Sequence, residues 1–134
     1  MTLPADFMLG STLIGMQTLD DLLITTGETD AMYRPFSVVD KLGDLSDEGN
    51  GFPVATWHWN ALAPGEADIL YGFIGTGLSA FVYFRTRLNR LTSGAYTYAT
   101  FSGWMNWMSG DEQVPALHVL DLTITFTGLT LIPD

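Results

Sequence analysis

The run His118-Val119-Leu120-Asp121-Leu122-Thr123-Ile124-Thr125-Phe126-Thr127 alternates between two kinds of side chain. Its even-numbered members are histidine or large apolar residues, and its odd-numbered members from 121 onward are aspartate and threonine. Side chains of a β-strand point alternately to the two faces of its sheet. The run therefore predicts a strand over 117–131 with one buried face and one exposed face.

Four other segments show strand signals. Phe36–Leu42 is rich in apolar β-formers, and Pro53–Asn60 places Ala55, Trp57 and Trp59 on one face. Ser79–Leu88 and Ala95–Trp107 also alternate, and the residues between them, 89–94, include Asn, Ser and Gly, which favour a hairpin turn. The chain is thus predicted to be mainly β.

One helix is predicted between these strands. Pro64 suits the first turn of a helix, and Glu66 and Asp68 lie where the helix dipole favours acidic residues. A stripe of apolar residues follows, and Gly75 is placed to end the helix. We therefore predict two packed antiparallel β-sheets, as a sandwich or partial barrel, with one short flanking α-helix in a single domain over 1–134. The predicted core aromatics are Trp57, Trp59, Phe73, Phe84, Phe101 and Phe126.

Three segments lack a clear periodic pattern. Residues 1–30 form a loosely structured N-terminal segment, with one strand expected near Thr18–Thr26. Gly43–Phe52 and Ser109–Pro115 are acidic and contain Gly or Pro, and we predict a loop for each. A loop as long as 43–52 rarely occurs in a compact domain without a function.

The charge balance excludes some functions. The 134 residues include 15 acidic and 5 basic side chains, for a net charge of -10, and there is no cysteine. Disulfides and thiolate metal sites are therefore excluded. Tight binding of nucleic acid is not expected either, because contacts to phosphate need a basic surface.

The charges are also sparse for a free monomer. A compact chain of this size exposes roughly 7,000 Å², so its 20 charged side chains leave about 350 Å² for each charge. The surface must then be polar but uncharged, or be covered by other subunits. Composition alone leaves both interpretations open.

No membrane-spanning or targeting segment is predicted. Ile69–Phe84 is a charge-free run of sixteen residues that contains three glycines, whereas a spanning helix needs about 20 mostly apolar residues. The first residues carry no Lys or Arg, so we expect no signal peptide and expect synthesis in a cytoplasm.

The search for catalytic or metal-binding groups finds no convincing set. His58 and His118 with Asp121 could hold a metal, but their spacing does not require it. The acids Asp44, Asp47 and Glu48 do not follow the order of a calcium-binding EF-hand loop. We therefore expect a protein that is not an enzyme and has no metal or other cofactor.

The aromatic residues admit two interpretations. An exposed platform for sugar would fit a carbohydrate- or ligand-binding β-sandwich module, whereas the same residues could pack in the core and between subunits. We favour packing and keep the binding module as an alternative. The residues concerned are Trp57, Trp59, Trp104, Trp107, Tyr96 and Tyr98.

The order of these parts resembles one family. A tryptophan-rich strand at Pro53–Trp59 precedes the short helix, and the strands Ser79–Arg87, Gly94–Met105 and Leu120–Leu129 follow it. Over about residues 36–131 the chain resembles the major tail (tail tube) proteins of long non-contractile-tailed bacteriophages, or siphophages.

The resemblance implies an assembly. Six copies would close a ring whose inner strands form one continuous β-barrel, and stacked rings would form a hollow tube that conducts DNA during genome ejection. The chain would be a structural protein of the virion tail, assembled in the host cytoplasm, with other tail proteins as partners. Terminal segments would seal the contacts, and the loop over 43–52 would reach the next ring through Asp44, Leu45, Ser46, Asp47, Glu48 and Asn50.

The tube interpretation also gives the acidic charge a role. Phosphates are repelled by an acidic wall, so double-stranded DNA would slide past it without being bound. We expect Asp121, Thr123, Thr125 and Thr127 to face the channel, because they form the small, polar face of their strand. A tail-tip or terminator adaptor of the same fold, present as a single ring, is a further alternative.

Overall fold

The computed structural model has ten strands and one helix among its described residues, which are 6–25, 28–35, 38–41, 47–50, 53–75, 77–92, 94–106, 109–113 and 118–133. Eight strands form one sheet, in which hydrogen-bonded neighbours follow the order β2-β1-β7-β8-β10-β6-β3, and β9 pairs with β10. Every pairing is antiparallel. The strands of this sheet are β1 (Met8–Gly10), β2 (Gln17–Thr18), β3 (Asp30–Arg34), β6 (Val54–Leu62), β7 (Ser79–Thr92), β8 (Ala95–Asn106), β9 (Ser109–Gln113) and β10 (His118–Ile132).

The sheet curls so that its two halves pack against each other. Tyr33 on β3 stacks on Phe101 on β8, with ring centroids 5.3 Å apart, although these strands are not neighbours in the sheet. Trp57 on β6 meets Phe84 on β7 edge-on at 5.9 Å. The predicted fold class, mainly β with one short helix, is confirmed, and the two packed layers are halves of one sheet.

The core lies inside this curl. Trp57, Trp59, Phe84 and Phe126 are fully buried, Phe101 is nearly so, and Phe73 is half-buried at its margin. The indole nitrogen of Trp57 donates a hydrogen bond to Thr86 Oγ1 at 2.9 Å, so the largest buried ring also satisfies its polar atom. Burial also raises the pKa of the Tyr33 phenol at the edge of this core.

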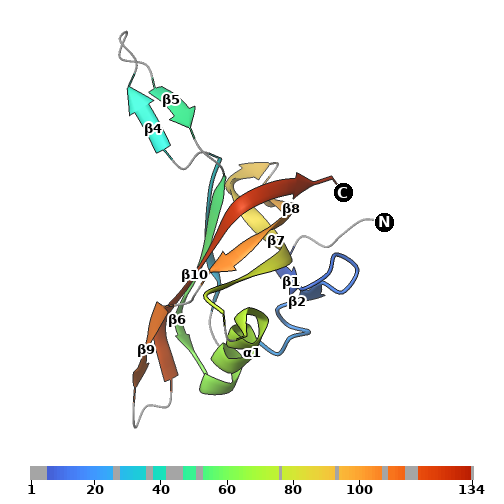
Figure 1. The fold of residues 1–134 in the computed structure, drawn as a ribbon, viewed down its shortest axis with the longest axis vertical. Coiled ribbons are helices and arrows are strands. Elements are labelled where there is room, and N and C mark those ends of the chain that lie inside the picture. Colours follow the sequence, from blue (N-terminus) through green and yellow to red (C-terminus); the bar gives the residue numbers. More distant parts are fainter. Residues whose placement is uncertain are drawn as a thin grey trace.

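Helix α1 (Pro64–Ile74) closes one end of the curl, below the sheet in Figure 1. It begins and ends where the sequence predicts, and Gly75 follows it with a φ of 68°, which favours glycine. Ala67, Leu70 and Ile74 are its buried apolar side chains. Its eleven residues are too few to cross a membrane. Among the described residues, no helix is both long enough and apolar enough to do so.

A buried carboxylate joins the helix to the N-terminal segment. Glu66 is only 7% exposed, and its two oxygens accept hydrogen bonds from the backbone N–H groups of Ala63 and Thr25, at 3.0 and 2.5 Å. Helix N-termini leave such N–H groups unpaired. The same side chain therefore caps the helix and fixes residue 25 against it.

Three sequence predictions are wrong in part. Residues 19–25 of the strand expected near Thr18–Thr26 are not a strand, because Leu22, Leu23 and Ile24 donate backbone hydrogen bonds three to five residues back and form turns after β2 ends at Thr18. Residues 109–113 form β9 rather than a loop, because they pair with β10. Strand β7 extends to Thr92, so that the turn before β8 is shorter than the predicted 89–94.

The acidic segment 43–52 also differs from its prediction. Within it, Asp47–Asn50 forms strand β5, which pairs with β4 (Val38–Lys41) in a separate two-stranded sheet. Strands β4 and β5 form a hairpin through backbone pairing. The polar sequence of β5 does not indicate such pairing. Figure 1 shows that β4 and β5 project from one end of the molecule, and that β9 and the start of β10 lie at the other end.

Gly103 is required by close packing. A Cβ at this position would lie 2.6 Å from Leu129 Cδ2 and 2.9 Å from the carbonyl oxygen of Thr127. Leu129 is buried, and it follows a bulge in β10 at Gly128, whose φ is 62°. The bulge and Gly103 together let β10 stay paired with β8 while Leu129 reaches the core.

We predict that Gly103→Ala lowers the free energy of unfolding by about 1–3 kcal/mol, because the backbone of β10 must move to admit the methyl group. Gly72→Ala is the matched control, since a Cβ at Gly72 meets no heavy atom within 4 Å. It should raise stability by up to about 1 kcal/mol, because alanine favours a helix interior. Urea unfolding followed by tryptophan fluorescence measures both, and equal effects of the two changes would contradict this packing.

Candidate assembly surface

The candidate site is the outward face of the sheet, which points away from the core. On β10, Leu122, Ile124 and Phe126 are fully buried, whereas Thr123, Thr125 and Thr127 between them are half-buried and Asp121 is exposed. The alternation read from the sequence thus separates a core side from an outward side. Strand β6 continues the outward side with Thr56, His58 and Asn60, because Thr125 pairs with Thr56 and Thr123 with His58.

These side chains form a strip that we call the hydroxyl strip: Thr56, His58, Asn60, Asp121, Thr123, Thr125 and Thr127. It contains no Lys or Arg, and Asp121 is its one acid. Its side chains offer hydroxyl, amide, imidazole and carboxylate groups at half-exposed to exposed positions. Such a surface is wettable and gives phosphate groups no cation to bind.

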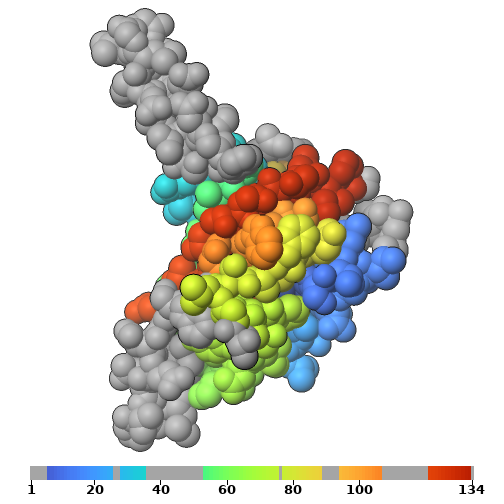
Figure 2. All heavy atoms as spheres, viewed as in Figure 1, coloured from blue at the N-terminus to red at the C-terminus, as the bar shows by residue number. Residues whose placement is uncertain are grey.

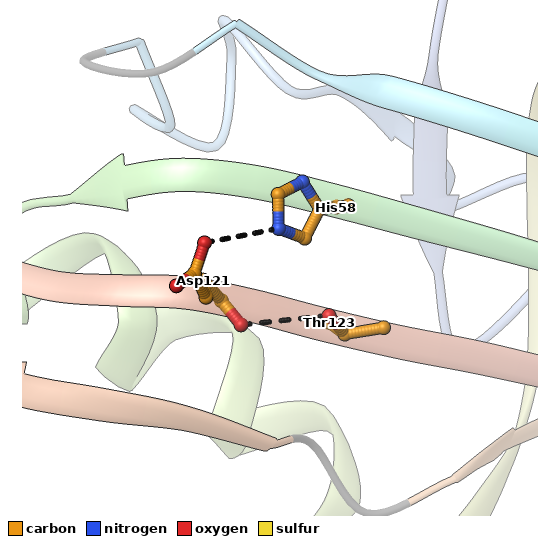
Figure 3. A network of polar contacts seen from close by, with 3 residues as sticks. All are labelled: His58, Asp121 and Thr123. Atoms are coloured by element: carbon orange, nitrogen blue, oxygen red, sulfur yellow. Dashed lines mark hydrogen bonds and ion pairs between the residues drawn. The ribbon is translucent and has the colours of Figure 1, made fainter.

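His58 and Asp121 meet at one end of the strip. Figure 3 shows His58 on β6 beside Asp121 on β10, with Nε2 of the imidazole 3.5 Å from Oδ1 of the carboxylate. The Thr123 hydroxyl donates to the backbone oxygen of Asp121 at 3.4 Å. The side chain of Asp121 is 74% exposed and that of His58 is 31% exposed, so water screens this pair and it contributes little to stability.

Asp121 also has an unusual backbone conformation. Its φ of 52° is in the left-handed region, which non-glycine residues rarely adopt. It lies in a bulge, since Leu120 pairs with Asp111 of β9 and Thr123 with Ser109, so that two residues of β10 lie opposite one residue of β9. The bulge bends β10 where its pairing with β9 ends.

Asn106 fixes the other end of the strip. Its side-chain nitrogen donates to the carbonyl oxygen of Thr125 at 2.9 Å and to the hydroxyl of Thr127 at 3.0 Å. A third contact, to the carbonyl oxygen of Trp104, measures 3.2 Å. One amide at the end of β8 therefore holds two threonines of the strip and its own strand in register.

Beside the strip, over β7 and β8, the outward face becomes aromatic. Phe81 contacts Tyr83 and Trp104 edge-on, with ring centroids 5.7 and 5.5 Å apart. Phe81 is 45% exposed and Trp104 47% exposed. We call these three residues the aromatic patch. In Figure 2, β8 (orange) and the start of β7 (yellow) lie between β10 (red) and the N-terminal segment (blue).

The structure thus brings together some predicted site residues and leaves others undetermined. Asp121, Thr123, Thr125 and Thr127 lie on one outward strip. Asp47, Glu48 and Asn50 lie on β5, whose side chains are not described, and Asp44, Leu45 and Ser46 lie outside the described residues. Their predicted contact with a neighbouring ring stays a prediction.

The structure also bears on the two alternative sites, the sugar platform and the metal site. Trp57 and Trp59 are fully buried, so they cannot form a sugar platform, whereas Trp104 and Tyr96 are about half exposed. The side chain of His118 is not described, and within the described part of the chain no three His, Cys, Asp or Glu side chains gather as metal ligands. Trp107 lies outside the described residues.

Sequence reasoning missed the aromatic patch as a unit. Ser79–Leu88 has apolar residues on both faces, with Ala80, Val82 and Phe84 opposite Phe81 and Tyr83. The pattern shows that both faces are apolar but not which one is covered. A strand with two apolar faces at the edge of a predicted core is the signal that could have indicated a second, exposed contact surface.

Comparison of the chain with models of protein families, with curated proteins and with solved structures finds no match. The geometry of the outward face therefore provides the evidence about function.

We predict that the positive φ of residue 121, and not the loss of the His58–Asp121 ion pair, determines how much a substitution there lowers the free energy of unfolding. Asp121→Ala should lower the free energy of unfolding by about 1 kcal/mol, because a Cβ without a stabilising polar group is strained at positive φ. Asp121→Gly removes the same carboxylate but relieves the strain, so it should be the more stable of the two. Chemical unfolding at pH 7 compares them, and equal losses in both variants would show instead that the ion pair dominates.

Proposed function

We propose that this chain is a structural subunit of a siphophage tail tube. Copies assemble into stacked, six-membered rings around a channel that conducts double-stranded DNA. The observation that carries the proposal is the hydroxyl strip, a half-exposed face without a basic side chain on a chain whose net charge is -10. A wall of this kind hydrates well and repels phosphate, so DNA passes it without binding.

The shape of the molecule supports stacking. The β4–β5 hairpin and the β9 end project from opposite ends of the molecule, along its longest axis (Figure 1). A subunit of a stacked tube must contact copies above and below it, and projections at both ends suit those contacts. The acidic hairpin would then reach the next ring, as the resemblance implies for residues 43–52.

The proposal places the protein in the virion tail, assembled in the host cytoplasm, with itself and other tail proteins as partners. It needs neither a cofactor nor catalysis. A carbohydrate-binding module is the weaker candidate, because the two tryptophans at the centre of its predicted platform are buried. A single-ring adaptor of the same fold differs only in whether its rings stack.

We predict that the purified protein forms particles far larger than 14.7 kDa. Their mass should rise as salt is increased from about 50 to 500 mM, because ions screen the repulsion between acidic chains. Multi-angle light scattering measures the mass, and negative-stain microscopy shows whether the particles are rings or tubes. A monomer at every salt concentration, or a monomer that binds glycans, would contradict the proposal.

We also predict that the β4–β5 hairpin is needed for stacking. Replacing residues 38–50 with two glycines should leave thermal unfolding nearly unchanged, because β4 and β5 pair only with each other among the described strands. The variant should form single rings where the unaltered protein forms tubes. Tubes of normal length from the variant would show that the hairpin does not connect rings, and single rings from the unaltered protein would favour the adaptor.

A further inference from the structure

One arginine of β7 is held between two aromatic rings. The guanidinium carbon of Arg87 lies 4.2 Å from the ring centroid of Tyr96 and 5.7 Å from that of Phe7. Cation–π contacts of this kind hold a guanidinium by its face. The five N–H donors point outward in the plane of the group, so the rings leave them free to bind an oxygen.

The guanidinium of Arg87 has no acidic partner in the part of the chain that the structure describes. It is partly buried, yet no described oxygen accepts a hydrogen bond or forms an ion pair with it. Its nitrogens reach solvent, because no buried side-chain nitrogen or oxygen among the described residues lacks a partner. Arg85 on the same strand differs, since it is 5% exposed and donates to Thr100 Oγ1 at 3.1 Å.

The rings that hold Arg87 are themselves anchored. Phe7 is buried and meets Trp57 of the core edge-on, with centroids 5.5 Å apart. It also meets Tyr98 edge-on at 5.6 Å. Tyr96 is 48% exposed, so the site is open on that side. We call Phe7, Arg87 and Tyr96 the Arg87 site. Because the core fixes its base, little side-chain entropy is lost when it binds a ligand.

We propose that the Arg87 site binds a carboxylate, and that this carboxylate belongs to the β9 end of a copy in the next ring. The planar fork of a guanidinium matches the two oxygens of a carboxylate and donates to both. The inference rests on the proposed function, because it names a contact through which one ring stacks on the next.

The register of the sheet places the Arg87 site and β9 at opposite ends. Strand β9 pairs with β10 within residues 118–123, and β8 pairs with β10 within residues 126–132, where the last pair involves Thr100. Strand β8 continues beyond Thr100, and Arg87 pairs with Tyr98 in that extension. The site therefore lies past the end of β10 that is remote from β9.

Stacked copies that point the same way bring these two ends together. The β4–β5 hairpin projects from the end opposite β9 (Figure 1), so the hairpin and the Arg87 site both face the β9 end of the next copy. Such a contact is head-to-tail and repeats along a tube.

Charge complementarity favours a second copy as the source of the carboxylate. Asp121 lies at the β9 end, and its side chain is 74% exposed. Strand β9 also contains Asp111 and Glu112. In a chain with a net charge of -10, most contacts between copies bring like charges together, whereas this one pairs a fixed cation with an acid. DNA phosphate is a weaker candidate, because binding it needs a basic surface.

The first test compares two arginines. Arg87→Gln should raise the concentration needed for tubes by at least about tenfold, because it removes both the charge and the fork. Arg34→Gln is the matched control, since it changes the net charge equally and Arg34 is exposed and outside the site. It should form tubes as the unaltered protein does. Tyr96→Phe keeps the ring and should stack normally, whereas Tyr96→Ala should weaken stacking. Thermal unfolding checks that each variant folds.

A carbodiimide crosslink then identifies the carboxylate. The one lysine of the chain is Lys41, so Arg87→Lys adds a single side-chain amine, which carbodiimide joins to a neighbouring carboxylate as an amide. This variant keeps the charge and should still form tubes at higher concentration. Its tubes should yield dimers on a denaturing gel, and mass spectrometry should find residue 87 joined to an acid within 109–121.

Several results would overturn the inference while leaving the proposed function intact. They are tubes from Arg87→Gln at the usual concentration, an equal defect in Arg34→Gln, and tubes of Arg87→Lys whose residue 87 is joined to no acid of another copy or to one outside 109–121. Binding of double-stranded DNA that Arg87→Gln abolishes, with stacking unchanged, would assign the site to phosphate instead. An unaltered protein that remains monomeric would overturn the proposed function as well.

Discussion

Phe126 occupies the position on which the rest of the structure depends. Its ring stacks on Phe84 with centroids 4.0 Å apart and meets Trp57 at 4.8 Å, so one residue of β10 joins β7 and β6 across the inside of the curl. All three rings are fully buried. Because side chains alternate along a strand, placing Phe126 in this cluster also places Thr125 and Thr127 on the outward face. Shifting β10 by one residue would put its threonines in the core and its apolar residues in water.

The outward face follows from this constraint. One part of it, over β10 and β6, is rich in hydroxyl groups and lacks basic residues, and the other, over β7 and β8, exposes an aromatic patch. A free monomer gains nothing from exposing half of Phe81 and Trp104, whereas a subunit can cover them with a neighbour. The proposed assembly would also account for the sparse charge of the chain, because surfaces that meet other copies need few charges. Fold, charge and exposed apolar surface are thus consistent with one assembled state.

The predictability of the fold varied with how each element is stabilised. The alternation in 118–127 and the Pro64 and Gly75 signals predicted β10 and α1 well, because those patterns reflect burial on one side and helix ends. Strands β5 and β9 have the sequences Asp-Glu-Gly-Asn and Ser-Gly-Asp-Glu-Gln, which carry no apolar alternation. They are strands because a partner strand pairs with their backbone, and local sequence does not encode that. Strand β3 was missed for a similar reason.

The candidate site was predictable to a similar degree. The threonines of β10 were expected on one outward face, and the structure places them there with His58 and Asn60 of β6 beside them. The aromatic patch could not be derived, because β7 is apolar on both faces and only the curl of the sheet decides which face is covered. The conformation of Asp121 and the exposure of Ile14, in the turn between β1 and β2, likewise depend on bulge and turn geometry, for which the sequence contains no periodic signal.

The central claim is that the hydroxyl strip lines a channel formed by copies of this chain. A cryo-electron microscopy map of the assembled protein tests it most directly, at a resolution that shows side chains. The account predicts a hollow assembly in which Thr123, Thr125 and Thr127 face the channel and β7 lies at a contact between subunits. A map with these threonines on the outer surface, or an assembly without a channel, would contradict it.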